Sequence, residues 1–140
     1  MTWFDLATGT LLRRGVVGHV LVGNAPLSDI TRADIARLSG AALVIRFDKF
    51  SDGRGFTAAR HVREVLAFTG QLVASGHVIP DQADYLRRVG FTHVEINHRM
   101  AIQWRRSLAL APPAMQRVLG SPRARSLIQN RPATAPRRRD

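Results

Sequence analysis

Residues 47–56 are the part of the chain whose residue types and spacing could do chemistry, because charged side chains and glycines alternate there. Arg54 has a glycine on each side, and an arginine offers a planar fork of donors that suits sulfite, phosphate or carboxylate oxygens. Backbone N–H groups beside these glycines would add donors at the start of a helix. Asp52 could orient Arg54 or act as a base. We therefore predict an anion-binding loop formed by Lys49, Asp52, Gly53, Arg54 and Gly55.

A second group of polar residues follows the next apolar run of the sequence. His77 comes at the end of that run, and Asp81 with Gln82 begins the helical pattern after it. We expect Asp81 to be the N-cap of this helix, whereas capping gives no reason for glutamine at position 82. If the strands are parallel, these residues lie at the same edge of the sheet as Arg54, where open α/β folds bind their ligands. We add His77, Asp81 and Gln82 to the predicted ligand-binding residues, and the catalytic candidates are Asp52, Arg54 and Asp81.

Other interpretations of these residues are left open. In a purely structural role, Asp52 would cap backbone amides and Arg54 would pair with Asp48 or Asp81. Residues 53–58 match the glycine spacing of a dinucleotide fingerprint, but five residues separate the first glycine from the strand, so nicotinamide or flavin binding has little support and no cofactor is evident. A metal site made of His77, His98 and Asp81 would lack any tight spacing motif, so we predict none.

Apolar runs alternate with helical patterns and give the elements that must position these side chains. Strands are expected at residues 18–22, 41–47, 72–74 and 91–96. Helical patterns begin near Thr31, whose spacing to Asp34 resembles a capping box, near Thr57, and at Pro80. Strands separated by single helices favour right-handed βαβ crossovers. The sequence therefore predicts a small α/β protein with a mostly parallel four-stranded sheet, either doubly wound or a half barrel.

The two ends of the chain differ in charge and composition. Residues 1–110 are expected to form a single α/β domain, and residues 111–140 a disordered tail rich in proline and arginine. Residues 1–98 carry 11 basic against 9 acidic side chains, whereas residues 99–140 carry 10 arginines against Asp140 alone. A nucleic-acid-binding module acting through this tail is the alternative function, because arginines contact phosphates without regard to sequence. Residues 111–140 contain no aromatic side chain for base stacking, so we do not favour nucleic acid as the partner.

The full composition excludes several classes of protein. The 140 residues include no cysteine, so disulfides, thiolate metal sites and cysteine-ligated iron–sulfur clusters are ruled out. No apolar run approaches the ~18 residues of a membrane-spanning helix, and the first residues lack the pattern of a secretion signal. We therefore expect a cytoplasmic protein without membrane contact. A small sheet with exposed edges leaves room for pairing with a second copy of the chain.

Spaced residues in the middle of the chain resemble a known family. The pattern consists of Phe50, Asp52, Gly53, Arg54, Gly55, Phe56, Thr57, Ala59, Arg60, Arg63, Gly70, Gly76, Asp81, Gln82, Leu86, Arg87, Arg88, Gly90 and Phe91. It is similar to the bacterial family called domain of unknown function nine hundred and thirty-four, over roughly residues 41–96. Two positions depart from the family, which usually has arginine in place of Val73 and an acid in place of His77.

The resemblance implies a function that the residues alone do not. The family is commonly described as an oxidoreductase of sulfite reduction, which implies a role in sulfate assimilation and cysteine biosynthesis. The implied partners are a small anion and the sulfite reductase hemoprotein. The sequence leaves open whether the chain is an oxidoreductase or a non-catalytic accessory protein. Because thiolates are absent, any redox cofactor would have to come from elsewhere.

Overall fold

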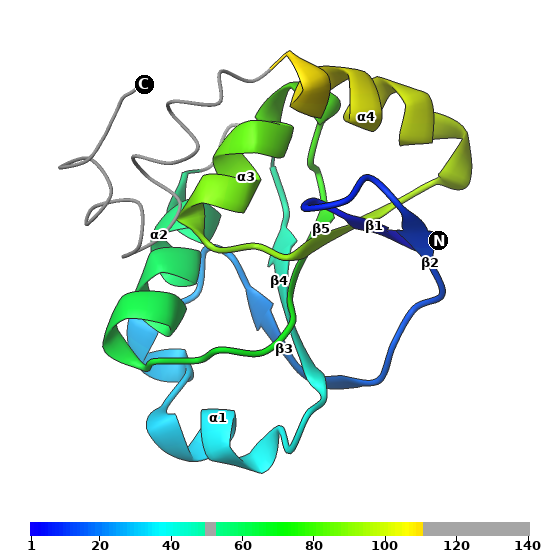
Figure 1. Ribbon diagram of the computed structural model, residues 1–140. Helices are drawn as coiled ribbons and strands as arrows, with labels where there is room; N and C mark the ends of the chain where they lie inside the picture. The colour runs from blue at the N-terminus through cyan, green and yellow to red at the C-terminus, as the bar shows by residue number, and fades with distance from the viewer. Residues whose placement is uncertain (50–52, 111–140) are drawn as a thin grey trace, which may run out of the picture. The chain divides into compact units, whose positions relative to one another are not determined.

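The computed structural model of the chain describes residues 1–49 and 53–110. Within this part, six strands form one sheet in the order β2-β1-β6-β5-β4-β3 (Figure 1). The strands are β1 (Thr2–Asp5), β2 (Leu11–Leu12), β3 (Val17–Val22), β4 (Ala42–Phe47), β5 (Leu72–Gly76) and β6 (His93–Ile96). Strands β3 to β6 are parallel and follow sequence order, whereas β1 is antiparallel to both β6 and β2.

The predicted mixed α/β fold with a mostly parallel sheet is confirmed, but the described sheet has six strands where four were expected. Both additional strands precede the first predicted one. The sequence around β1 and β2 contains no pattern that predicts a strand, because β1 has only four residues. The longest pairing of β1 is with β6, far away in the sequence, where Thr2 lies opposite Ile96. The parallel strands lie side by side in sequence order, so the sheet is not doubly wound.

Short helical segments connect the strands. They are η1 (Leu27–Asp29), α1 (Arg32–Arg37), α2 (Arg54–Arg60), η2 (His61–Val65), η3 (Pro80–Gln82), α3 (Ala83–Val89), η4 (His98–Met100) and α4 (Ala101–Ala109). Segment η2 continues α2 as a π-helix, and η1, η3 and η4 are 3-10 turns. Helix α2 begins at Arg54, earlier than the predicted start at Thr57. None of the described helices is long and apolar enough to cross a membrane.

The predicted capping box at the start of α1 is present. The Thr31 hydroxyl accepts from the Asp34 N–H at 3.3 Å, and the Asp34 carboxylate accepts from the Thr31 N–H at 2.8 Å. The bond from the Thr31 N–H is also the main reason that the pKa of Asp34 lies below its ordinary value. These two bonds satisfy backbone donors that a helix start leaves unpaired, so they fix where α1 begins.

The larger hydrophobic core lies on one face of the sheet. Side chains alternate along each strand, so Leu43 and Ile45 of β4 point to this core together with Phe4 of β1. Every α-helix contributes to it, through Ile35 of α1, Ala59 of α2, Leu86 of α3 and Trp104 of α4. Figure 1 shows α1, α2 and α3 along one side of the strands. All four α-helices therefore cover the same face.

The second face of the sheet carries a smaller apolar cluster of Trp3, Ala42, Val44 and Val73. Residues 13–16, here called the connecting segment, join β2 at one edge of the sheet to β3 at the other. A methyl group added at Gly15 would lie 3.0 Å from the Trp3 ring, so this segment packs on the second face. Its Arg14 pairs with Glu95 of β6 at 2.7 Å. Part of the second face is thus covered by a loop and not by a helix.

Arg63 holds three segments of the chain together. Its Nε and Nη2 atoms donate to the Gly90 carbonyl at 2.9 and 2.7 Å, and its Nη1 donates to the Phe68 carbonyl at 2.8 Å. The guanidinium also lies 5.2 Å from the centre of the Phe68 ring. Burial lowers the pKa of Arg63 below its ordinary value. The side chain therefore connects the π-helical end of α2, the loop after it and the end of α3.

Replacing Arg63 should destabilise the fold. Arg63→Ala leaves two carbonyls without their charged donor, and we expect the free energy of unfolding to fall by about 2–4 kcal/mol. The measurement is urea denaturation followed by circular dichroism. The control is Arg60→Ala, an exposed arginine one turn earlier that should cost less than about 0.5 kcal/mol. Equal losses in the two variants would contradict the role of Arg63.

Candidate functional site

The predicted anion-binding loop follows β4, at the carboxyl end of the strand. Lys49 is exposed and lies just past Phe47, the last residue of β4. Gly53 is the N-cap of α2, exposed Arg54 is its first residue, and Gly55 is buried. The fifth residue of the predicted loop, Asp52, lies outside the described residues.

The other predicted site residues follow β5, which is the parallel neighbour of β4. His77 is exposed and comes directly after β5, while Asp81 and Gln82 belong to η3. The His77 N–H donates to the Phe47 carbonyl at 2.8 Å, so the ends of the two strands are bonded to each other. All described members of the predicted site therefore follow neighbouring strands at one edge of the sheet.

Two glycines allow the chain to turn at this edge. Gly76 has φ +84°, a conformation that L side chains rarely adopt, and a methyl group there would be 2.3 Å from the Phe47 carbonyl oxygen. A methyl group at Gly55 would be 2.3 Å from the Phe47 ring, so α2 packs closely against the end of β4. Both glycines are required by close contact with Phe47.

Aromatic rings in tilted contact join the first turns of α2 and α3 next to the predicted site. The ring of Phe56 lies 5.1 Å from that of Phe47 and 4.8 Å from that of Tyr85, measured between centres. Aromatic pairs at such distances add about 0.5–1.5 kcal/mol each beyond burial. Helix α2 and helix α3 are therefore held together next to the predicted site.

Gly53 differs from the other glycines at this edge. Its φ of −75° and ψ of −5° are open to any residue. An added methyl group would meet nothing within 4 Å in the described structure. Neither backbone conformation nor space requires glycine at this position. A glycine in such a place also lets a ligand approach the backbone closely, which fits the predicted anion-binding loop.

The structure corrects the sequence analysis at η3. We expected Asp81 to cap the helix and Gln82 to have no capping role. The Asp81 side chain makes no capping hydrogen bond at the start of η3. The Gln82 side-chain oxygen instead accepts from the Ile79 N–H at 3.0 Å. The Gln82 side chain is long enough to reach back to this N–H, so glutamine at position 82 has a capping role. Asp81 is exposed and has no capping role.

Two charged side chains at this edge pair with each other, and no group of metal ligands is found among the described residues. Asp48 pairs with Arg46 of β4, whose Nε lies 3.3 Å from its carboxylate. Arg46 is a residue that sequence analysis missed, although it is the one charge within an apolar strand. Across residues 1–49 and 53–110, no three histidine or acidic side chains are grouped closely enough to hold a metal ion. His77, His98 and Asp81 are thus not grouped in the way that the metal-site alternative would require.

A comparison with protein families assigns the chain. A family model described as "Bacterial protein of unknown function (DUF934)" matches residues 20–123. The chain belongs to this family. Comparison with curated proteins and with solved structures finds no match. The family is therefore established by sequence, and its description names no activity.

Many residues of the pattern on which the resemblance rests have a structural role. The Arg63 guanidinium donates to the Gly90 carbonyl, and Gly90 has φ +119°. Gly55 and Gly76 make room for Phe47. Leu86 and Phe91 are buried in the core, and Arg87 and Arg88 pair with Asp84. Among the described residues of the pattern, Gly53, Thr57, Arg60 and Asp81 are exposed and have no evident structural role. Gly53 and Asp81 both lie at the carboxyl edge of the parallel strands, which makes that edge the best candidate site.

The two positions that are expected to depart from the family lie in different surroundings. Val73 is fully buried on the second face, where its neighbours across the sheet are Val44 and His93. His77 is exposed at the candidate site. The first departure makes the middle of the second face apolar, and the second places an imidazole among the site's cations.

A matched pair of glycine variants tests the contrast between Gly53 and Gly76. We expect Gly53→Ala to change the free energy of unfolding by less than about 1 kcal/mol, because its φ and its surroundings accept a methyl group. Gly76→Ala should cost more than about 2 kcal/mol or prevent folding, because of its positive φ and the Phe47 carbonyl. Thermal denaturation measures both. A Gly53→Ala protein as unstable as Gly76→Ala would contradict this assignment.

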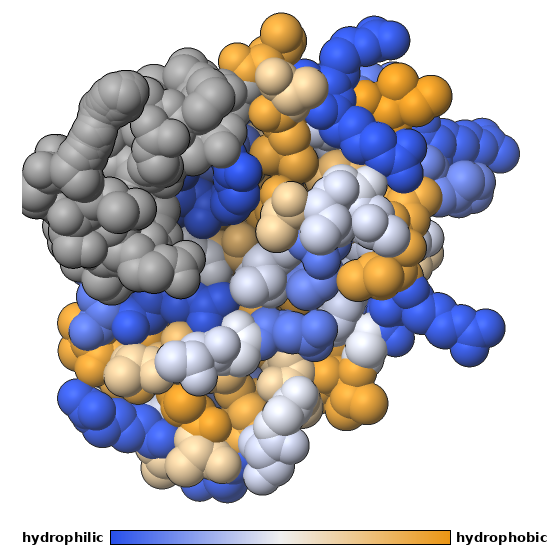
Figure 2. Space-filling model, viewed as in Figure 1, coloured by the Kyte–Doolittle hydropathy of each residue, from blue (hydrophilic) through white to orange (hydrophobic). Residues whose placement is uncertain are grey.

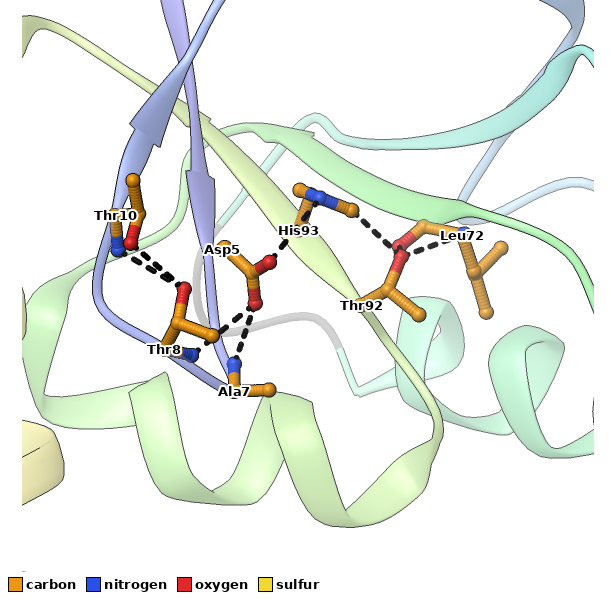
Figure 3. A network of polar contacts seen from close by, with 7 residues as sticks. All are labelled: Asp5, Ala7, Thr8, Thr10, Leu72, Thr92 and His93. Atoms are coloured by element: carbon orange, nitrogen blue, oxygen red, sulfur yellow. Dashed lines mark hydrogen bonds and ion pairs between the residues drawn. The ribbon is translucent and has the colours of Figure 1, made fainter.

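A separate polar network lies at the amino end of β6 (Figure 3). His93 is only 6% exposed, its Nδ1 lies 2.8 Å from the Thr92 hydroxyl, and its Nε2 lies 3.9 Å from the Asp5 carboxylate. The Thr92 hydroxyl also bonds to the backbone of Leu72. Burial lowers the pKa of His93, and Asp5 opposes this in part. The network joins β1, β5 and β6, so its role is structural.

His93 should make stability depend on pH. Because its pKa is lowered in the folded chain, the unfolded chain binds a proton first as the pH falls below about 6.5. Stability should therefore decrease with falling pH in this window, with a slope of at most about 1.4 kcal/mol per pH unit from this group. His93→Gln should show a smaller slope in urea denaturation between pH 7.5 and 5.5. The lowered pKa of Asp34 affects stability only at lower pH, outside this window. Identical slopes in the wild type and in His93→Gln would therefore exclude His93 as the cause.

Proposed function

We propose that this protein binds a small anion at the carboxyl edge of its parallel strands and serves sulfite reduction as an accessory protein. The observation that carries the proposal is the gathering of Lys49, Arg54 and His77 after β4 and β5, two strands whose ends are bonded together. Basic side chains at this edge suit a small oxygen-rich anion. The matched family description names no activity, so we propose sulfite as the anion only from the role in sulfite reduction that the resemblance implies.

The composition of the chain supports an accessory role over an independent redox role. Reduction of sulfite requires several electrons, and proteins deliver these through bound cofactors. The chain contains no cysteine, so it cannot ligate an iron–sulfur cluster through thiolates. Its glycine spacing after β4 also departs from the dinucleotide fingerprint, because a loop separates strand and glycine. We propose that the sulfite reductase hemoprotein supplies the redox centre and that this chain binds its substrate or product.

The alternative function through the basic end of the chain concerns mostly residues 111–140, which lie outside the described residues. In the described part, α4 carries exposed Arg105 and Arg106 beside the exposed apolar Ile102. Arg105 is engaged, because its Nε donates to the Gly9 carbonyl at 2.8 Å. Figure 2 shows hydrophilic and hydrophobic side chains mixed over this part of the surface, at the upper right of the view. Such a mixture is not a continuous phosphate-binding stripe.

Arg54 is the residue whose replacement tests the proposal. We expect the purified full chain to bind sulfite in isothermal titration calorimetry, and Arg54→Ala to weaken binding at least about tenfold through the loss of charge-assisted hydrogen bonds. In cells, the same variant should fail to support growth on sulfate while growth on cysteine stays normal. Arg60→Ala, an exposed arginine later in α2, is the matched control.

Three results would overturn parts of this proposal. Normal growth of the Arg54→Ala strain on sulfate would remove the site. Nicotinamide-dependent turnover of sulfite by the purified chain would replace the accessory role with catalysis. Loss of function on removal of residues 121–140 alone, with sulfite binding intact, would favour the nucleic-acid alternative.

A further inference from the structure

Strand β3 is an edge strand of the sheet. It stands last in the strand order, with β4 on one side and no described strand on the other. It has six residues, whereas β2, the edge strand at the opposite end of the order, has only two. The side of β3 away from β4 is here called the free side. Backbone donors and acceptors on such a side can pair with a further strand.

The hydrogen bonds to β4 determine which residues of β3 turn their backbone to the free side. The Gly23 N–H donates to the Arg46 carbonyl at 2.7 Å, so Gly23 faces β4. In a strand, the backbone groups of successive residues point alternately to the two sides. Val22 and Val20 therefore present their N–H and carbonyl groups to the free side.

Pairing on the free side is limited to the middle of β3. The register with β4 shifts between Val17 and His19, so the strand is regular only from His19 onward. At the other end, the Val22 carbonyl already accepts from the Ala25 N–H at 2.9 Å. Val20 is thus the residue of the regular part of β3 whose N–H and carbonyl are both available for a further strand.

This part of the chain is apolar and uncharged. Val20 is 51% exposed, and Val16, just before β3, is 77% exposed. Residues 15–28 contain no Asp, Glu, Lys or Arg, although 22% of the whole chain is charged. Proteins commonly protect an edge strand with charged side chains, proline or very short length. The β2 edge is protected in this way, because β2 is short and Arg13 and Arg14 follow it, whereas the regular part of β3 has no such protection.

A second copy of the chain fits the free side for electrostatic and geometric reasons. The net charge is +11, so two copies repel each other where their basic surfaces meet, and the uncharged residues 15–28 allow contact without this repulsion. An acidic partner protein would gain no attraction there. Antiparallel pairing about a twofold axis puts Val20 opposite Val20 of the other copy, and each then donates one backbone hydrogen bond and accepts one.

We propose that the chain forms a homodimer in which β3 pairs antiparallel with β3 of a second copy, so that the two sheets become one. Val20 lies on the twofold axis. Its side chain points to the second face of the sheet, because it lies opposite Val44 of the smaller apolar cluster. The two exposed Val20 side chains pack against each other on that face. This inference goes beyond the proposed function and does not depend on it.

The dimer leaves both candidate sites open. Strand β3 ends close to the site, because a methyl group added at Gly23 would lie 3.2 Å from the Gly55 Cα atom at the start of α2. Antiparallel pairing reverses the strand direction in the second copy. The carboxyl ends of the two sets of parallel strands therefore lie at opposite ends of the joined sheet, and the two sites bind their ligands independently.

The experiment measures the mass of the purified full chain by sedimentation equilibrium over a wide range of concentration. We expect a species of twice the 15.5 kDa mass of one chain. Val20→Lys and Val20→Glu should each weaken association at least about tenfold, because like charges then face each other across the axis. An equimolar mixture of the two variants should associate more strongly than either alone, because lysine then faces glutamate.

The matched control is Leu12→Lys, which puts the same charge on an exposed side chain of β2, the other edge strand. It should leave the association within about twofold of the wild type, as surface substitutions away from an interface do. Circular dichroism checks the folding of each variant.

Each result has a defined meaning. A wild type that keeps the mass of one chain at every concentration overturns the inference, and so does a dimer that Val20→Lys leaves intact or that Leu12→Lys also dissociates. A mixture no stronger than its components overturns the pairing of Val20 with its own copy. If a variant does not fold, amide hydrogen exchange of the wild type decides. Slower exchange at Val20 and Val22 in concentrated than in dilute protein supports the dimer, and equal exchange overturns it.

Discussion

Phe47 is the residue on which the candidate site depends, because both loops of the site are fixed to it. Its carbonyl accepts the His77 N–H at 2.8 Å, which joins the end of β4 to the end of β5. Its ring fills the space that Gly55 leaves open, and it lies 5.1 Å from the Phe56 ring and 5.9 Å from the Phe91 ring, measured between centres. The backbone of Phe47 therefore sets the spacing of the two loops, and its side chain sets the start of α2.

The fold could be predicted from the sequence where the signals are local. Uninterrupted apolar runs gave β4 and β5, and the spacing of Thr31 and Asp34 gave the start of α1. The N-terminal strands could not be predicted, because β1 pairs with a strand at the far end of the described chain. The start of α2 was placed at Thr57, since a hydroxyl is a common cap, whereas the structure begins the helix at Arg54 with no side-chain cap.

The candidate site was predictable in its location but not in its full set of residues. Parallel strands place their carboxyl ends together, which brings Lys49, Arg54 and His77 to one edge without further information. Which face of the sheet a strand residue points to depends on register and on where the helices pack, and a sequence read alone gives neither. Arg46 of β4 was therefore missed. Gln82 was misjudged for a related reason, because its bond to Ile79 becomes visible only in three dimensions.

The pairing of β1 with β6 also determines when the fold can be completed. Thr2 and Ile96 face each other across the sheet, so the first strand has to wait until nearly all of the described chain has been synthesised. Such non-local pairing slows folding, because a long loop must close before the contact is made. Until then, the edge of β6 stays unpaired and Trp3 stays in water. Burial of this indole is thus a natural fluorescent signal for the last step of folding on the ribosome or after release from it.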